Sequence, residues 1–366
     1  MRKYEMQEVE RIHNSKQTIT EDGFTVYLKE SPTAGAGHMD TYEKACLNNN
    51  WVAGKDDGRP APPPEILIPI IRENMGFANR CLNTEEMITK CEEFVFEGNK
   101  VELWRYYKRR SENKARPCLF FIHGGGWIGG SVYTVENPCK LIAEMADAVV
   151  FNIEYSLAPE KPFPNGFNDC YYAIQHVYDH AEEYGIDKTR ITVAGDSAGG
   201  NLSAALSLRA RDEKNPMISG QFLIYPGVVF GETVPEGYHW TMDAYEIAEE
   251  EKDIIVPMLG LGKPGKVKDD LMKGCYVEDE EAAKNPYVSP ALAESFENLP
   301  RTAIAVAEFD GLRIQGEYYG KLLENAGVPV KVYRYTGMTH AFLDRLGFVP
   351  QCEELCMEIA SFVKGE

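Results

Sequence analysis

Gly195-Asp196-Ser197-Ala198-Gly199 is the stretch of sequence that decides the fold, because of what stands on either side of it. Residues 190–194 before it are β-branched and apolar and predict a strand, whereas residues 201–206 after it favour a helix. A serine on so sharp a strand-to-helix turn has strained backbone angles, and the flanking glycines remove side chains that would clash. The hydroxyl of Ser197 is therefore expected to stand exposed at the carboxyl end of a strand, as a candidate nucleophile.

Strand-like and helix-like segments alternate on both sides of this turn. The predicted strands are residues 92–96, 101–107, 118–123, 149–155, 191–196, 221–225, 302–307 and 328–335. The predicted helices are residues 134–148, 166–184, 198–211, 312–326 and 350–364. The first two strands read as a hairpin, and the others alternate with helices. This order predicts an α/β fold with a mostly parallel eight-stranded sheet and helices on both faces.

Two segments fall outside the alternation. Residues 1–90 contain a helix-like stretch at 43–51, a proline-rich break, and an apolar run at 66–71 that Pro69 interrupts. Residues 228–290 are acidic and aromatic. Both leave the sheet where loops gather above the strand ends, which predicts a joint lid, although two separate surface decorations remain the alternative. The predicted organisation is an N-terminal cap segment (1–90), a first core part (91–227), a cap insertion (228–290) and a second core part (291–366).

A lone serine is a weak nucleophile and needs a base, a group that orients the base, and donors for a developing oxyanion. His340 is the candidate base, because it follows the strand that ends at Tyr335 and lies on a loop at the carboxyl edge of the sheet. Asp310 follows the strand 302–307 and is the candidate orienting acid, with Glu308 as the alternative. The chain order Ser197, Asp310, His340 is the order known for nucleophile-elbow sheets.

A glycine loop, His123-Gly124-Gly125-Gly126-Trp127, follows the apolar strand residues 119–122. Glycines let backbone N–H groups approach a substrate oxygen closely, and the N–H of Ala198 supplies a further donor. Residues 124–129 also satisfy the dinucleotide pattern G-x-G-x-x-G, but the leading histidine and the later elbow serine argue against nicotinamide binding. Trp127 and Asp196, which flank the loop and the serine, are candidate substrate-binding residues.

Charge and cysteine content exclude several classes of protein. The formal net charge of −19 argues against nucleic acid and against anionic membrane surfaces as partners. The nine cysteines are scattered, odd in number and without a C-x-x-C pair, which predicts free thiols in a reducing compartment and no metal site. The first residues lack a signal-peptide core, so a cytoplasmic protein is expected. The sequence leaves the oligomeric state open, with a homodimer among the alternatives.

Three motifs in order resemble the hormone-sensitive-lipase-like esterases of the α/β-hydrolase superfamily. Residues 123–127 look like the family's H-G-G-G signature, residues 195–201 like its G-D-S-A-G-G elbow, and residues 155–160 like its Y-R-L-A-P-E segment. The resemblance covers roughly residues 90 to 365. It departs at Ser156, where the family has arginine, and at Gly311, where the family's D-P-L-R-D has proline.

The resemblance implies an α/β-hydrolase fold and a serine carboxylesterase that acts on small-molecule esters with short or medium acyl chains. It implies Ser197 as nucleophile, His340 as base and Asp310 as acid, without metal or organic cofactor. It assigns the oxyanion hole to Gly124, Gly125, Gly126 and Ala198, with Gly124 shaping the loop. An amidase or peptidase on the same fold, and a non-catalytic ligand-binding member, are the alternative functions.

Overall fold

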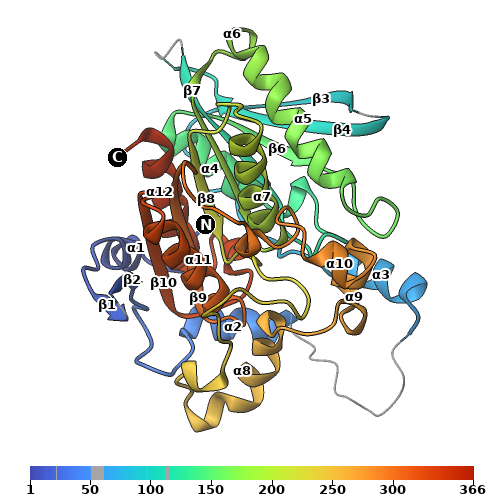
Figure 1. Ribbon diagram of the computed structural model, residues 1–366. Helices are drawn as coiled ribbons and strands as arrows, with labels where there is room; N and C mark the ends of the chain where they lie inside the picture. Colours follow the sequence, from blue (N-terminus) through green and yellow to red (C-terminus); the bar gives the residue numbers. More distant parts are fainter. Residues whose placement is uncertain (22, 51–61, 97, 112–114) are drawn as a thin grey trace.

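One ten-stranded sheet organises the computed structural model, which describes residues 1–21, 23–50, 62–96, 98–111 and 115–366 (Figure 1). Its strands are β1 (Thr18–Glu21), β2 (Phe24–Lys29), β3 (Met87–Phe96), β4 (Asn99–Lys108), β5 (Arg116–Ile122), β6 (Val149–Glu154), β7 (Ile186–Asp196), β8 (Gly220–Ile224), β9 (Arg301–Phe309) and β10 (Val330–Thr339). The strand order is β1-β2-β10-β9-β8-β7-β5-β6-β4-β3. All neighbours from β2 to β6 pair in parallel, and only β1, β3 and β4 run antiparallel to their neighbours. The predicted mostly parallel sheet is confirmed.

The sheet has two strands more than the eight that the sequence predicts, because a hairpin from residues 1–90 joins its edge. Strand β2 pairs in parallel with β10, with Val332 opposite Val26. Phe24 and Val26 are buried in the same apolar cluster as Val332. This segment therefore does not lie wholly above the sheet, since its first strands extend the sheet and cover the side of β10.

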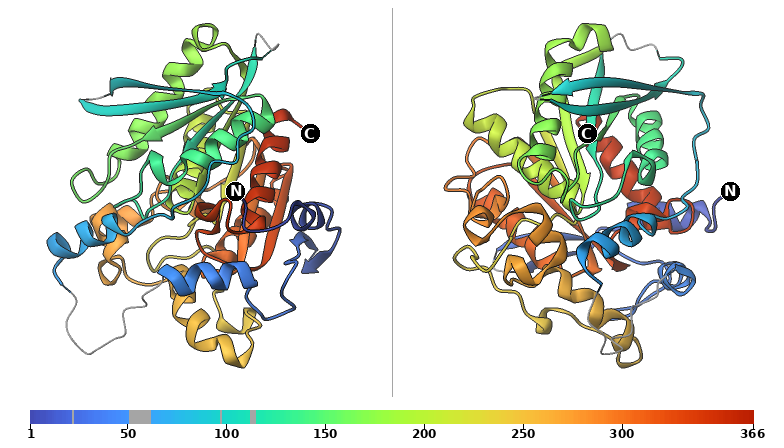
Figure 2. Two further views of the ribbon diagram at one scale, coloured as in Figure 1. Left: turned by 180° about the vertical axis from the view of Figure 1, so that it is seen from behind. Right: turned by 90° about the vertical axis from the view of Figure 1, so that its right-hand side faces the viewer.

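Helices cover both faces of the sheet. The helices around it are α1 (Met6–His13), α4 (Glu136–Ala146), α5 (Asn165–Asp179), α6 (Ala181–Tyr184), α7 (Ala198–Asp212), α11 (Arg313–Asn325) and α12 (Pro350–Lys364). Helices α4 and α12 pack on one face, and α5, α7 and α11 pack on the other, as the right-hand view of Figure 2 shows. The predicted helix 166–184 is two helices, α5 and α6, which meet at His180.

The central strand β5 shows why two helical layers form. Cys118, Phe120 and Ile122 face the layer of α5 and α7, whereas Leu119 and Phe121 face α4 and α12. All five side chains are fully buried. Side chains alternate between the two faces of a strand, so a strand that is apolar at every position needs cover on both sides.

The remaining helices lie at the carboxyl ends of the strands. They are α2 (Thr41–Asn50), α3 (Pro64–Glu73), α8 (Lys252–Met258), α9 (Leu271–Tyr276) and α10 (Glu280–Ala283) (Figure 1). The apolar run 66–71 forms α3 with Pro69 inside it, and Ile68 packs against the core cluster that contains Trp127. Residues 51–61, which include most of the proline-rich break and the end of the predicted helix 43–51, lie outside the described residues. The division into cap and core parts stays a prediction.

All nine cysteines are free thiols, as the sequence predicts. Within the described ranges, no helix combines the length and the apolar character needed to cross a bilayer. A cytoplasmic location and a homodimer stay predictions.

Candidate active site

Ser197 lies at the sharp turn between β7 and α7. Its backbone angles, φ 54° and ψ −113°, lie in a region that residues other than glycine rarely adopt. The N–H of Ser197 donates to the Ile224 carbonyl oxygen of β8 at 2.9 Å. A Cβ at Gly195 would lie 2.4 Å from backbone atoms of Gly199, and one at Gly199 would lie 1.8 Å from the Ile122 carbonyl oxygen. The two glycines are therefore required because strand, turn and helix pass within contact distance of one another.

The structure brings Ser197, His340 and Asp310 together from three strand ends. His340 Nε2 lies 2.9 Å from Ser197 Oγ, and His340 Nδ1 lies 2.7 Å from Asp310 Oδ2. The Asp310 carboxylate is fully buried, and its other oxygen accepts the Leu312 N–H at 2.8 Å, which fixes its orientation. Because β7, β8, β9 and β10 are parallel neighbours, their carboxyl ends meet at one edge of the sheet.

Asp310, rather than Glu308, contacts the imidazole. The Glu308 carboxylate accepts the N–H of Gly337 at 2.7 Å and so holds the loop that leads to His340. Burial lowers the pKa of His340, but attraction to Asp310 and the hydrogen bond to it outweigh this effect and leave the pKa raised. The pair of His340 and Asp310 thus favours a proton on the imidazole, as a base beside an orienting acid requires.

The glycine loop presents free amide groups beside Ser197. The N–H of Gly124 donates to Asp196 Oδ1 at 2.8 Å, so it is not available to a substrate oxygen. The predicted place of Gly124 in the oxyanion hole is therefore corrected: Gly124 shapes the loop and does not donate to the oxyanion. Among the described residues, no hydrogen bond engages the N–H groups of Gly125, Gly126 or Ala198. These three amides are the candidate oxyanion donors.

His123 holds the glycine loop through buried contacts. Its ring is fully buried, stacks on Tyr155 with 4.4 Å between ring centroids, and contacts the Gly124 carbonyl oxygen through Nδ1 at 2.8 Å. Burial lowers the pKa of His123 to about 4, so the ring stays neutral near pH 7. A Cβ at Gly130 would lie 2.1 Å from the Gly124 oxygen, which shows how tightly the loop folds back on itself.

A cavity of about 240 Å³ opens over Ser197 and the glycine loop. Its lining is mainly apolar, and it includes residues from the two segments predicted to form the cap: Met75 and Gly76 from residues 1–90, and Leu261, Asp270, Met272 and Lys273 from residues 228–290. Trp127 forms part of the wall, stacked on Tyr276 and edge-on to Phe230. A substrate-binding role for Trp127 stays a prediction.

Two carboxyl groups lie beside the reacting residues. Asp196 lines the cavity, but its contact with Gly124 ties the serine turn to the glycine loop, and its substrate-binding role stays a prediction. Burial raises the pKa of Asp196 to about 6. Burial and the charge of Asp196 raise the pKa of Asp344, another lining residue, to about 8. Sequence reasoning missed Asp344, although it stands only four residues after His340 on the same loop.

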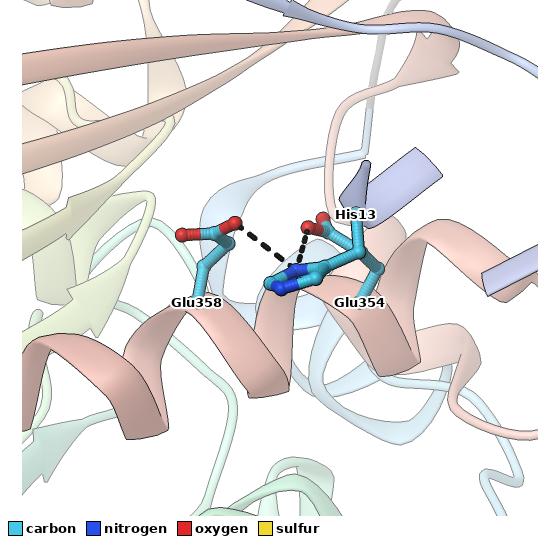
Figure 3. Close-up of side chains that lie close together, drawn as sticks. All are labelled: His13, Glu354 and Glu358. Carbon is cyan, nitrogen blue, oxygen red and sulfur yellow. Dashed lines mark hydrogen bonds and ion pairs between the residues drawn. The ribbon is translucent and has the colours of Figure 1, made fainter. Parts of the chain in front are cut away.

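One group in the described part of the chain has the ligand types and spacing of a metal site. His13 lies between Glu354 and Glu358 of α12, with Nδ1 at 3.2 and 3.3 Å from their carboxylates (Figure 3). However, Lys29 Nζ lies 2.6 and 2.5 Å from the same two carboxylates. Because an ammonium group already forms ion pairs with both carboxylates, we interpret the cluster as an ion-pair network that fastens α1 and β2 to α12.

Comparisons with known proteins agree with this architecture. A family model described as the alpha/beta hydrolase fold matches residues 119–344. Esterase LipI of Mycobacterium tuberculosis is 34% identical over 239 residues, 65% of this chain and 69% of LipI. An arylesterase of Saccharolobus solfataricus is 34% identical over 260 residues, 71% of this chain and 77% of its own length.

Solved structures show the same likeness. The structure of an arylesterase superposes with a TM-score of 0.70 and 28% identity, covering 89% of this chain and 98% of its own. A hyperthermophilic esterase from the archaeon Pyrobaculum calidifontis has a TM-score of 0.66 and 29% identity, covering 82% of this chain and 90% of its own. The matched region, residues 119–344, contains the glycine loop, the serine turn and His340. The chain belongs to the α/β-hydrolase family and, within it, to the hormone-sensitive-lipase-like esterases.

Proposed function

We propose that this carboxylic ester hydrolase cleaves esters of short and medium acyl chains through an acyl-enzyme formed on Ser197. The observation that carries the proposal is the continuous chain of contacts from Ser197 Oγ to His340 Nε2 (2.9 Å) and from His340 Nδ1 to Asp310 Oδ2 (2.7 Å). A base within hydrogen-bond reach of the nucleophile, itself oriented by a third group, is the geometry of nucleophilic acyl transfer.

The proposed reaction has two similar halves. Ser197 Oγ attacks the ester carbonyl carbon while His340 Nε2 takes its proton, and the carbonyl oxygen becomes an oxyanion that faces the amides of Gly125, Gly126 and Ala198. His340 then gives the proton to the leaving alcohol oxygen as the C–O bond breaks. A water molecule repeats the attack on the acyl-enzyme, with His340 again as base, and releases the carboxylic acid and free Ser197. Each oxyanion donor typically contributes about 3 kcal/mol to barrier lowering.

The size and lining of the cavity support a preference for small acyl groups. Its volume of about 240 Å³ is below the roughly 300–1,000 Å³ typical of sites for drug-sized ligands. Apolar side chains such as Met75, Phe230 and Leu312 line it beside the nucleophile. We propose that the N-terminal segment and the insertion act together as a cap, because both contribute lining residues.

Ser197→Ala and a fluorophosphonate probe test the proposal directly. Hydrolysis of p-nitrophenyl butyrate is expected to fall to the background rate in Ser197→Ala, with an unchanged melting temperature. The probe is expected to label the natural protein at Ser197 and to leave Ser197→Ala unlabelled. Full activity in the variant refutes the nucleophile, and a natural protein that neither reacts with the probe nor hydrolyses esters supports a ligand-binding role.

Two substrate series define the specificity. A p-nitrophenyl ester series from acetate to palmitate is expected to give its highest kcat/KM at short and medium chains, and an optimum at long chains contradicts the proposed preference. Matched esters and amides of the same acid separate an esterase from an amidase or peptidase. We expect the ester to be the better substrate by a wide margin.

A further inference from the structure

The loop that carries His340 is held by a carboxylate from a segment far away in the sequence. Glu43 lies on α2 and is fully buried. Its Oε1 accepts the backbone N–H of Thr339 at 3.1 Å and makes still closer contacts with Thr339 Oγ1 and Arg345 Nη1. Because Thr339 immediately precedes His340, Glu43 fixes the backbone from which the imidazole projects.

Arg345 holds the same loop from the other side of His340. Its Nη2 donates to the His340 carbonyl oxygen at 3.4 Å, and its Nη1 also reaches Thr339 Oγ1 at 3.4 Å. Burial lowers the pKa of Arg345, but the charge of Glu43 raises it again and the net pKa is raised. The guanidinium therefore stays charged, and its buried charge is compensated mainly by Glu43, with a smaller contribution from Asp344.

Helix α2 is itself fixed to the end of β10, so Glu43 has little freedom to move. The N–H of Asp40 donates to the Gly337 carbonyl oxygen at 3.0 Å. The Asp40 carboxylate accepts Ser31 Oγ at 2.6 Å, Gln351 Nε2 at 3.0 Å and, at the start of α2, the Tyr42 N–H at 2.8 Å. Figure 1 shows α2 below the carboxyl ends of β9 and β10, the strands that lead to Asp310 and His340.

We propose that Glu43 is a positioning residue for the catalytic base, which acts through Thr339 and Arg345 and not by touching the substrate. The inference rests on the proposed function of His340. When Glu43 loses its negative charge, Arg345 loses the strongest of the charges that compensate its buried guanidinium, and the N–H and hydroxyl of Thr339 are left with a weaker, neutral acceptor. The loop then shifts, and a displacement of about 1 Å between base and nucleophile is enough to lower turnover by about 100-fold.

The test uses Glu43→Gln and Thr339→Val, with Glu353→Gln as the matched control. Glu353 is also a buried carboxylate that accepts three hydrogen bonds from the N-terminal segment, from Arg2 Nε, Arg2 Nη2 and Tyr4 Oη, each at 2.7 Å. Glu353 lies on α12, and within the described residues it forms no hydrogen bond with the loop that carries His340. We expect both Glu43→Gln and Glu353→Gln to lower the melting temperature.

Of the two glutamine variants, only Glu43→Gln is expected to affect catalysis. In Glu43→Gln, kcat for p-nitrophenyl butyrate falls by about 10- to 100-fold with KM within about twofold, since the base and not the substrate site has moved. The acidic limb of the kcat/KM profile moves to lower pH, because His340 loses part of its attraction to Asp310. The losses in kcat from Glu43→Gln and Thr339→Val are expected to be non-additive, because both weaken the same contact.

The inference is overturned if Glu43→Gln keeps the kcat and the pH profile of the natural protein, or if Glu353→Gln lowers kcat as much. An NMR titration of His340 in the Ser197→Ala background repeats the test without turnover, and an unchanged pKa on adding Glu43→Gln also overturns it. Failure of the proposed function is recognised separately, by a natural protein that neither hydrolyses esters nor reacts with the fluorophosphonate at Ser197.

Discussion

Replacing Asp310 by asparagine is expected to leave the site in place and almost abolish turnover. Asp310 has one oxygen on the Leu312 N–H at 2.8 Å and the other on His340 Nδ1 at 2.7 Å. In the variant, the amide oxygen keeps the bond from Leu312, and the amide NH₂ group faces Nδ1. An NH₂ group can only donate, so Nδ1 becomes an acceptor and the imidazole proton moves to Nε2.

That tautomer presents an N–H to Ser197 Oγ, and the base can no longer take the serine proton. The same change in a serine protease lowers kcat by about 10⁴-fold, which corresponds to about 5.5 kcal/mol of barrier. We expect a loss of this size in the hydrolysis of p-nitrophenyl butyrate. The acidic limb of activity is also expected to move to lower pH, because Asp310 raises the pKa of His340.

Glu308→Gln is the matched control, since Glu308 is a half-buried neighbour whose carboxylate accepts the Gly337 N–H at 2.7 Å. A glutamine oxygen keeps this contact, so kcat is expected to stay close to that of the natural protein. Circular dichroism confirms that both variants fold. The reasoning is refuted if Asp310→Asn retains more than a tenth of the activity, or if Glu308→Gln is the variant that loses it.

Three further predictions concern the glycine loop and two titrating groups. Gly124→Ala is expected to lower kcat by about 100-fold, because the added Cβ would lie 2.4 Å from Asp196 Oδ2 and displace the glycine loop. Gly35→Ala is the control: its Cβ would have no neighbouring atom within 4 Å, and kcat is expected to stay unchanged. Folding raises the pKa of Asp344, so ionisation of this carboxyl group opposes folding. Asp344→Asn is therefore expected to become more stable relative to the natural protein as pH rises from 5 to 9. If the free energies of urea unfolding of the two proteins differ equally at pH 5 and pH 9, the prediction is wrong. His13→Gln is expected to lower the melting temperature more at pH 5.5 than at pH 9, because contact with Glu354 raises the pKa of His13, and its stabilising effect is lost as pH rises through that value.

The sequence predicts the central part of the molecule well, because the relevant signals are local. The strands that lead to Ser197 and Asp310 contain short apolar runs, and the strand that leads to His340 alternates apolar and charged residues. Parallel strands bring their carboxyl ends to one edge. The strand–turn–helix pattern at Ser197 then places the serine at that edge. Three residues far apart in the chain could therefore be expected to converge before any distance was known.

The edge of the sheet was missed because its partner is distant in sequence. Residues 18–21 and 24–29 alternate and are separated by Asp22-Gly23, a dipeptide typical of hairpin turns. The predictions from sequence did not use this local signal for a hairpin, and nothing in the signal indicates that β2 pairs with β10. The prediction of a cap over residues 1–90 therefore overlooked strands that extend the sheet.

The contacts of Glu43 and Gly124 could not be predicted for a different reason. Glu43 is an acidic residue in the first turn of a helix, where a solvated side chain that favours the helix dipole is the ordinary expectation. Its buried contacts depend on how α2 meets the end of β10. Likewise, the hydrogen bond from the Gly124 N–H to Asp196 depends on the exact positions of two loops in space. A sequence motif does not contain that information.

Strand β2 pairs with β10, and Glu43 contacts Thr339, so residues near the start of the chain depend on residues near its end. These contacts therefore form late during synthesis of the chain. Glu43 and Thr339 are 296 positions apart, so Glu43 cannot make this contact until the ribosome has made nearly everything between them. At about 5–20 residues per second, that wait is about 15–60 s. During translation the serine turn can fold while its base is still missing or loosely held. A nascent chain therefore passes through most of its synthesis as an inert precursor, and hydrolysis begins only when its early and late parts meet.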